Sequence, residues 1–406
     1  MSQKVIDFIN QNWDECVRNN MKDEGTLIGM PYSYTIPAIG HFEEMYYWDT
    51  YFTNLGLLIG GRPQLAKNNV DNMLYLVNRY GFMPNGNRKC LLNQSQPPFL
   101  SEMVRDIYEY YKDPVWLLSA YSVLKREYEF WQTRRSFDIG LNHYGGNAET
   151  EKTCTEMADY FKSRVKIEVK LDNISLGKHC RALCESGWDM NPRFGLECDK
   201  YAPVDLNSLL FMLEKNMSYF ANELNIDESD LWEHRAQTRK TVMLSRMDNG
   251  GGILLDYMIE RDSLSEILSA ASFFPLYAKL ATNEGAKVMV ENLSRLEEDY
   301  GILTCEKNNA EGVYQWDYPN GWACLQYIAV KGLDNYGFDA EANRIAQKYI
   351  SLVDKVFDET GKLWEKYNIV TGSLDVNNEY EQPAMLGWSA GVYMSMYKYL
   401  EKSNLY

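Results

Sequence analysis

Basic residues are scarce in this chain of 406 residues, where 41 Lys and Arg stand against 57 Asp and Glu and the net charge is −16. Such an acidic chain disfavours nucleic acid and anionic membranes as partners. No apolar run approaches the ~20 residues of a transmembrane helix. Residues 1–17 lack the apolar core and cleavage site of a signal peptide and predict an amphipathic helix instead. We therefore expect a cytoplasmic protein.

Cysteines at CxxC spacing are also missing from the sequence. The eight Cys form no CxxC motif, so we expect reduced thiols and not a disulfide framework. His179, Cys180, Cys184 and Cys198 lie close together in the sequence, but their spacing fits no standard zinc pattern. We predict neither a metal site nor a cofactor.

Aromatic residues, in contrast, are abundant, with 30 Tyr and 10 Trp in the chain. Their rings suit a site that stacks on polyols and forms hydrogen bonds with them, although any single ring is as well explained by packing between helices. The Trp and Tyr residues concentrate in long polar segments that separate helical stretches.

Strands are hard to find in the sequence, whereas apolar periodicity predicts twelve or thirteen helices. Beyond the N-terminal helix and one through residues 50–58, they cover about 63–80, 100–112, 114–132, 153–161, 202–222, 227–246, 263–281, 286–299, 323–331, 339–357 and 388–402. Short connections pair the helices, and no linker divides the chain, so we predict one all-α domain over residues 1–406. Closing six helix pairs into a ring would gather the long loops at one end. An open solenoid is the alternative, but the sequence repeat that it requires is absent.

Two carboxylates stand out in these loops. Asp189 follows Trp188 in a segment where Gly187 and Pro192 oppose a regular helix. A ring can stack on a sugar face, and apolar surroundings can raise the pKa of the acid until it holds a proton near neutral pH. Glu365 lies beside Lys366, whose charge would favour the ionised form if it is close enough. The plainer reading of each acid is a surface ion pair or a helix cap.

Seven segments, in order, resemble the motifs of the trehalase family. The first signature is GHFEEMYYWDTY at 40–51, and the second is QWDYPNGWA at 315–323. The other five segments are residues 84–88, 95–99, 185–189, 203–207 and 365–367. The resemblance extends over about residues 35–395.

This resemblance implies an (α/α)6 barrel and an inverting glycoside hydrolase that acts on a small α-glucoside. By motif, Asp189 is similar to the family's general acid and Glu365 to its general base. Glycoside hydrolysis with inversion needs such a pair, placed about 6.5–9.5 Å apart to leave room for water. The positions implied to line or brace the sugar pocket are Phe42, Tyr46, Trp48, Asp49, Asn85, Arg88, Gln94, Gln96, Trp188, Arg193, Trp316, Asp317, Asn320, Trp322, Glu379 and Trp388.

Three positions depart from the family pattern. The family has Arg where this chain has His41 and Gln94, and its Arg-Pro-Glu-Ser segment is replaced by other residues at 147–152. Neither Gln nor His reproduces the bidentate hydrogen bonding of a guanidinium. Lys152 is a candidate for a replacement cation.

These departures leave the substrate open between trehalose, another α-linked disaccharide, and a glucosylated or mannosylated small acid such as glucosyl- or mannosyl-glycerate. Two other classes of function remain as alternatives. A sugar isomerase or epimerase fits less well, because only His41 among four His lies in a motif. A non-catalytic carbohydrate-binding protein would have no use for both Asp189 and Glu365. The sequence does not indicate the oligomeric state.

Overall fold

The computed structural model describes residues 2–403, so residues 1 and 404–406 of the predicted domain lie outside the described part of the chain. Within residues 2–403 there are fourteen α-helices, and the nine strands are only two or three residues long. The all-α prediction is therefore confirmed.

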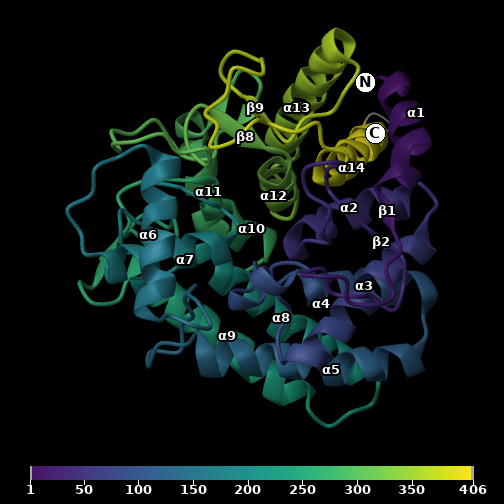
Figure 1. Cartoon of the computed structure of the whole chain (residues 1–406), viewed down its shortest axis with the longest axis horizontal. Coiled ribbons are helices and arrows are strands. Elements are labelled where there is room, and N and C mark those ends of the chain that lie inside the picture. Colours follow the sequence, from purple (N-terminus) through teal and green to yellow (C-terminus); the bar gives the residue numbers. More distant parts are fainter. Residues whose placement is uncertain (1, 404–406) are drawn as a thin grey trace.

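Six helices form a closed inner ring, and each contacts the next around the circle (Figure 1). In order they are α2 (Tyr47–Ile59), α4 (Leu100–Tyr111), α8 (Val204–Glu223), α10 (Phe274–Tyr277), α12 (Ala323–Asp334) and α14 (Gly387–Ser403). The last helix packs against the first through glycines, since a Cβ on Gly391 would lie 1.9 Å from the carbonyl oxygen of Phe52. The ring confirms the predicted (α/α)6 barrel.

An outer layer accompanies this ring. Most outer helices directly follow an inner one in the sequence: α3 (Pro63–Tyr80), α5 (Pro114–Arg134), α9 (Ser229–Arg246), α11 (Asn283–Glu291) and α13 (Asp339–Thr360). The N-terminal helix α1 (Gln3–Asn12) packs against α13, where the rings of Phe8 and Phe357 lie 5.0 Å apart. The segment before α1 also contacts α14, because the backbone N–H of Ser2 donates to the hydroxyl of Tyr393 at 3.3 Å.

A further hairpin, α6 (Glu151–Val165) and α7 (Asn173–Ser186), is inserted before α8. The sequence predicted α6 but not α7, whose helical pattern is interrupted by Gly177. That glycine lets the two helices approach closely, because a Cβ there would lie 2.1 Å from the carbonyl oxygen of Cys154. The side chain of Asp172 caps α7 by accepting from the backbone N–H groups of Ile174 and Ser175.

One predicted helix, at about 263–281, is wrong. Residues Ser263–Leu264 form a strand, Ala270–Phe273 a 3₁₀ turn, and only Phe274–Tyr277 are α-helical. Serine side chains bind backbone groups here, as when Ser272 donates to the carbonyl of Leu254, and these bonds compete with helix formation. Pro275 has no N–H to donate and therefore sits at the helix start.

The strands form four small antiparallel sheets that brace the loops. Their bounds are β1 (Val17–Arg18) with β2 (Tyr34–Thr35); β3 (Tyr201–Ala202), β4 (Tyr257–Met258) and β5 (Ser263–Leu264); β6 (Glu297–Glu298) with β7 (Gly301–Ile302); and β8 (Asn320–Trp322) with β9 (Lys366–Asn368). In the last sheet Trp322 pairs with Lys366, which fixes Glu365 next to the second signature segment.

Aromatic side chains fill the axis of the ring. Tyr51 stacks on Phe99 with ring centroids 4.6 Å apart, and its hydroxyl lies 2.6 Å from that of Tyr277. Tyr51 lies one turn along α2 from Trp48, and with Phe99 beside α4 and Tyr277 on α10 it forms a packed layer behind the loops. The space available to a ligand is therefore at the loop end of the barrel.

Candidate active site

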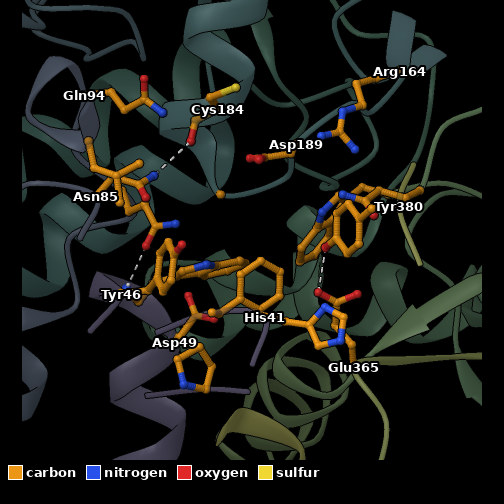
Figure 2. Close-up of a pocket in the computed structure, with 18 of the residues that line it drawn as sticks. His41, Tyr46, Asp49, Asn85, Gln94, Arg164, Cys184, Asp189, Glu365 and Tyr380 are labelled. Atoms are coloured by element: carbon orange, nitrogen blue, oxygen red, sulfur yellow. Dashed lines mark hydrogen bonds between the residues drawn. The ribbon is translucent and has the colours of Figure 1, made fainter. Parts of the chain in front are cut away.

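A cavity of about 700 Å³ opens at this end of the barrel (Figure 2). Its size falls within the usual range for small-molecule sites. Many of the residues assigned from the sequence line it: Phe42, Tyr46, Trp48, Asp49, Asn85, Gln94, Gln96, Asp189, Trp316, Trp322, Glu365 and Trp388. They come from loops far apart in the sequence, so the ring closure brings them together.

Asp189 reaches the cavity because α7 ends abruptly. The helix stops at Ser186, and Gly187 takes a left-handed conformation with φ of 72°. A Cβ on Gly187 would lie 2.8 Å from Cε2 of Trp48, so this turn also needs the absence of a side chain. The sequence predicted no helix between residues 161 and 202, whereas residues 184–186 are the last turn of α7.

The environment of Asp189 favours its protonated form. Burial raises the pKa of this carboxyl to about 7, the charge of Glu365 adds to the rise, and the Arg164 guanidinium opposes it. A carboxyl with this pKa can hold a proton near neutral pH and deliver it to a ligand.

Glu365 is surrounded by hydrogen-bond donors. Lys366 Nζ donates to one carboxylate oxygen at 2.7 Å, and the Tyr380 hydroxyl donates to the other at 2.6 Å. Trp388 Nε1 donates to the Glu365 carbonyl and holds the backbone. Hydrogen bonds and a neighbouring cation both stabilise an ionised carboxylate. Figure 2 shows Asp189 and Glu365 reaching the cavity from different sides.

Asp49 is the third carboxyl of the cavity. It is not a helix cap, because Tyr46 occupies the N-cap position of α2 and Asp49 lies within the first turn. Burial raises the pKa of Asp49 to about 8, and the nearby Glu365 and Asp189 charges act in the same direction. At neutral pH this carboxyl can therefore both donate and accept hydrogen bonds.

Four tryptophans give the cavity an apolar wall. The rings of Trp316 and Trp322 stack at 3.7 Å, and Trp388 stands perpendicular to Trp316. Trp48 lies 5.7 Å from Trp316. Rings at several orientations around one space can cover the faces of a sugar.

Arg193 does not line the cavity, although the sequence placed it in the pocket. Its side chain is fully buried and forms ion pairs with Asp205 at 3.1 Å and Asp256 at 2.8 Å. The guanidinium lies 4.3 Å from the ring of Trp188, which in turn packs 5.4 Å from Trp316. Both Arg193 and Trp188 therefore stand behind the wall, where they support it.

Four more assigned residues lie outside the cavity lining. Arg88 forms an ion pair with Glu44. Asp317 accepts from Asn308 at 2.7 Å, and Asn320 donates to the carbonyls of Gln315 and Asn377. The pKa of Glu379 is raised to about 9, by burial first and then by Asp189, and one of its oxygens is buried with no hydrogen-bond partner among residues 2–403.

Two arginines in the cavity lining were missed from the sequence, namely Arg164 on α6 and Arg181 on α7. No local motif marks either residue, and α7 itself was not predicted. The expected cation Lys152 instead lies on the surface with 84% of its side chain exposed, where it faces Glu156. His41 lies at the exposed mouth of the cavity.

Comparison with known proteins now decides the family. The trehalase family profile matches residues 2–401. The chain belongs to the trehalase family. It is 32% identical to the periplasmic trehalase of Xanthomonas oryzae over 94% of this chain and 70% of that one. It is 30% identical to the periplasmic trehalase of Pseudomonas aeruginosa over 97% of this chain and 76% of that one. As a member of this family the protein is a trehalase-like glycoside hydrolase.

Solved structures agree with this placement in the trehalase family. Neutral trehalase from Saccharomyces cerevisiae superposes with a TM-score of 0.78 at 29% identity, covering 98% of this chain and 80% of that one. The GH63 mannosylglycerate hydrolase of Thermus thermophilus shares the fold, with a TM-score of 0.66 at 17% identity, covering 97% and 99% of the two chains.

The expected cytoplasmic location is contradicted by these relatives of the trehalase family. The curated proteins from Xanthomonas and Pseudomonas are named periplasmic trehalases.

Within residues 2–403, no helix combines the length and apolarity needed to cross a bilayer. Over the same residues, no cluster of three or more His, Cys, Asp or Glu has the arrangement of a metal site.

Proposed function

We propose that this protein hydrolyses trehalose, or a closely related α-linked glucoside, with inversion at the anomeric carbon. The names of its relatives support trehalose as the first substrate to test. We further propose that residues 1–406 act as one catalytic domain, a proposal supported by the single hydrophobic core that joins all six inner helices.

The observation that carries the proposal is the contrast between Asp189 and Glu365 across one cavity. Burial raises the pKa of Asp189 to about 7, whereas Glu365 accepts hydrogen bonds from a lysine and a tyrosine. Two carboxyls in such different environments suit one acid and one base. Glycoside hydrolysis requires this division of roles.

In the proposed reaction a glucose ring occupies the tryptophan-lined floor of the cavity. Asp189 gives its proton to the glycosidic oxygen while the bond from that oxygen to the anomeric carbon breaks. Glu365 takes a proton from a water molecule whose oxygen forms the new bond to the same carbon. The first product is then β-glucose, together with the released leaving group.

The floor residues have proposed binding roles. Asp49, Asn85 and Gln96 face the glucose hydroxyls, and Gln96 is held in place because its Oε1 accepts from the backbone N–H of Trp48 at 3.2 Å. Stacking on Trp316 and Trp322 would supply apolar contact with the sugar face.

The experiment is an incubation of the purified protein with trehalose, other α-linked glucose disaccharides, and glucosyl- and mannosyl-glycerate. Early time points are followed by ¹H NMR, which separates the two anomers of released glucose before they equilibrate. We expect cleavage of trehalose with β-glucose and α-glucose appearing in equal amounts, because the leaving sugar keeps its α configuration. Two equivalents of α-glucose would contradict inversion, and cleavage of only the glycerate derivatives would contradict the substrate.

A further inference from the structure

The mouth of the cavity differs chemically from its floor. Trp48, Asp49 and Glu365 on the floor are almost fully buried, whereas His41 and Glu381 at the mouth are exposed. Arg164 and Arg181 are half-buried and line the α6–α7 side. A disaccharide whose first ring lies on the floor must extend its second ring toward this mouth.

The hydrogen-bond partners of the Arg164 and Arg181 guanidiniums are neutral groups, although the charge of Arg164 also acts on the pKa values of Asp189 and Glu379. Within residues 2–403, neither forms an ion pair with an acidic side chain. Arg164 donates to the backbone carbonyl of Glu379 at 2.8 Å, and Arg181 donates to Oε1 of Gln94 at 2.8 Å. A guanidinium has five N–H donors, so each retains donors for a ligand.

Arg181 also fixes the orientation of Gln94. Since Oε1 of Gln94 accepts from Arg181, the amide nitrogen becomes the free end of that side chain. Gln94 is 7% exposed and lies beside Asn85 and Cys184 in the wall of the cavity (Figure 2). The pair thus presents a rigid set of donors on one side of the space, while Arg164 presents others beyond Asp189 (Figure 2).

We propose that Arg181 and Gln94 form the subsite for the leaving group and decide which leaving groups are accepted. This proposal rests on the proposed glycosidase reaction. The donors of Arg181 and Gln94 suit a leaving group rich in acceptor oxygens, such as a second sugar or a carboxylated polyol. Arg181 acts on specificity, since neither the bond broken nor the proton transferred involves it.

The test compares trehalose with α-glucosyl fluoride, whose leaving group is a single fluoride ion that cannot contact the mouth. Arg181→Gln removes the cation and its bond to Gln94. We expect kcat/KM for trehalose to fall about 10- to 100-fold, the range for a lost hydrogen bond to a charged group. The loss for α-glucosyl fluoride should be smaller by about tenfold or more.

Lys178→Gln is the matched control, because Lys178 lies on the same helix, carries the same charge and pairs with Glu149 away from the cavity lining. Gln94→Leu and the double variant complete the set and carry the test if Arg181→Gln unfolds. If the pair acts as a unit, the double variant loses no more than the worse single variant.

The outcomes separate the hypotheses. Equal losses on both substrates, or no loss on trehalose, would overturn the leaving-group assignment. Failure of the wild-type protein to cleave either substrate would instead contradict the proposed function itself.

Discussion

Two groups of buried carboxyls in this fold have different partners. Asp205 and Asp256 both form ion pairs with the buried guanidinium of Arg193. Asp49 and Asp189 have no ion-pair partner within residues 2–403, and burial raises the pKa of each carboxyl to about 8 and about 7. The first group fixes the loops in place, while the second group remains free to exchange protons with a ligand.

This difference follows from the physics of buried charge. A buried ion pair broken at one partner leaves an uncompensated charge, so the Arg193 cluster is expected to matter for stability. A buried carboxyl without a cation avoids that cost by keeping its proton, which makes it useful as an acid. Substitutions in the Arg193–Asp205–Asp256 cluster should therefore mainly lower stability, whereas substitutions of Asp49 and Asp189 should mainly change activity.

The largest expected effect is on the rate. Asp189→Asn and Glu365→Gln keep the size of each side chain but remove proton transfer, which contributes about 10²- to 10⁴-fold in enzymes. We expect kcat for trehalose to fall by at least that range in either variant, measured by glucose release. The thermal unfolding midpoint serves as the control and should not fall in Asp189→Asn. Glu365→Gln leaves the buried Lys366 without its carboxylate partner, so its midpoint should fall, and its kcat is measured well below that midpoint. Undiminished turnover in one variant would remove the proposed role of that residue.

Arg193→Met tests the ion-paired cluster of Arg193, Asp205 and Asp256. It leaves Asp205 and Asp256 buried without a cation, and we expect a loss of about 3–5 kcal/mol in the free energy of unfolding, measured by urea titration at neutral pH. The triple variant Arg193→Met, Asp205→Asn, Asp256→Asn should recover part of that loss, because it removes the unpaired charges. A loss well below about 1 kcal/mol in the single variant would mean that the cluster contributes little.

The same contrast shows what the sequence could predict. The barrel was predictable because helix periodicity and loop composition are local, and Asp189 and Glu365 were predicted from local motifs. Adjacency does not tell which way a side chain points, so Arg193 was assigned to the pocket although it faces Asp205 and Asp256.

The α6–α7 side of the cavity was beyond prediction for a different reason. Gln94 and Arg181 are 87 positions apart, and their contact depends on how α7 packs in three dimensions. The sequence therefore indicated Lys152, within the altered segment 147–152, as the replacement cation.

The pH dependence of kcat/KM should reveal the ionisation of Asp189. Asp189 must be protonated to act, and its pKa is raised from 3.8 to about 7. We expect kcat/KM for trehalose to be limited by this group only on the alkaline side, falling about tenfold per pH unit above about pH 7. The residual activity of Asp189→Asn, which has no such proton to lose, should lack this decline. A wild-type profile that stays flat to about pH 9 would exclude Asp189 as the acid.

Asp49→Asn should stabilise the protein while it weakens substrate binding. The pKa of Asp49 is raised from 3.8 to about 8 in the folded state, so the folded protein binds a proton that the unfolded chain has released between these values. The stability contributed by the protonated group is complete below the unfolded pKa and is lost as pH rises toward 8. We expect a gain of about 1–3 kcal/mol in the variant at about pH 8 and little gain at about pH 4, from urea titrations at both values. A destabilised variant at the higher pH would show that the carboxylate is compensated by contacts of its own.

The smallest expected effect separates the two candidate cations on the α6–α7 hairpin. Lys152 is 84% exposed and lies 3.8 Å from the exposed Glu156, an arrangement that contributes about 0–0.5 kcal/mol to stability. Lys152→Ala should therefore leave kcat/KM for trehalose within about twofold of wild type and the free energy of unfolding within about 0.5 kcal/mol. Arg181→Gln, measured beside it, should lower kcat/KM for trehalose about 10- to 100-fold, since of these two cations Arg181 is the one that lines the cavity. A raised KM in Lys152→Ala would mean that the start of α6 folds over the cavity when substrate binds, and that both cations serve the leaving group.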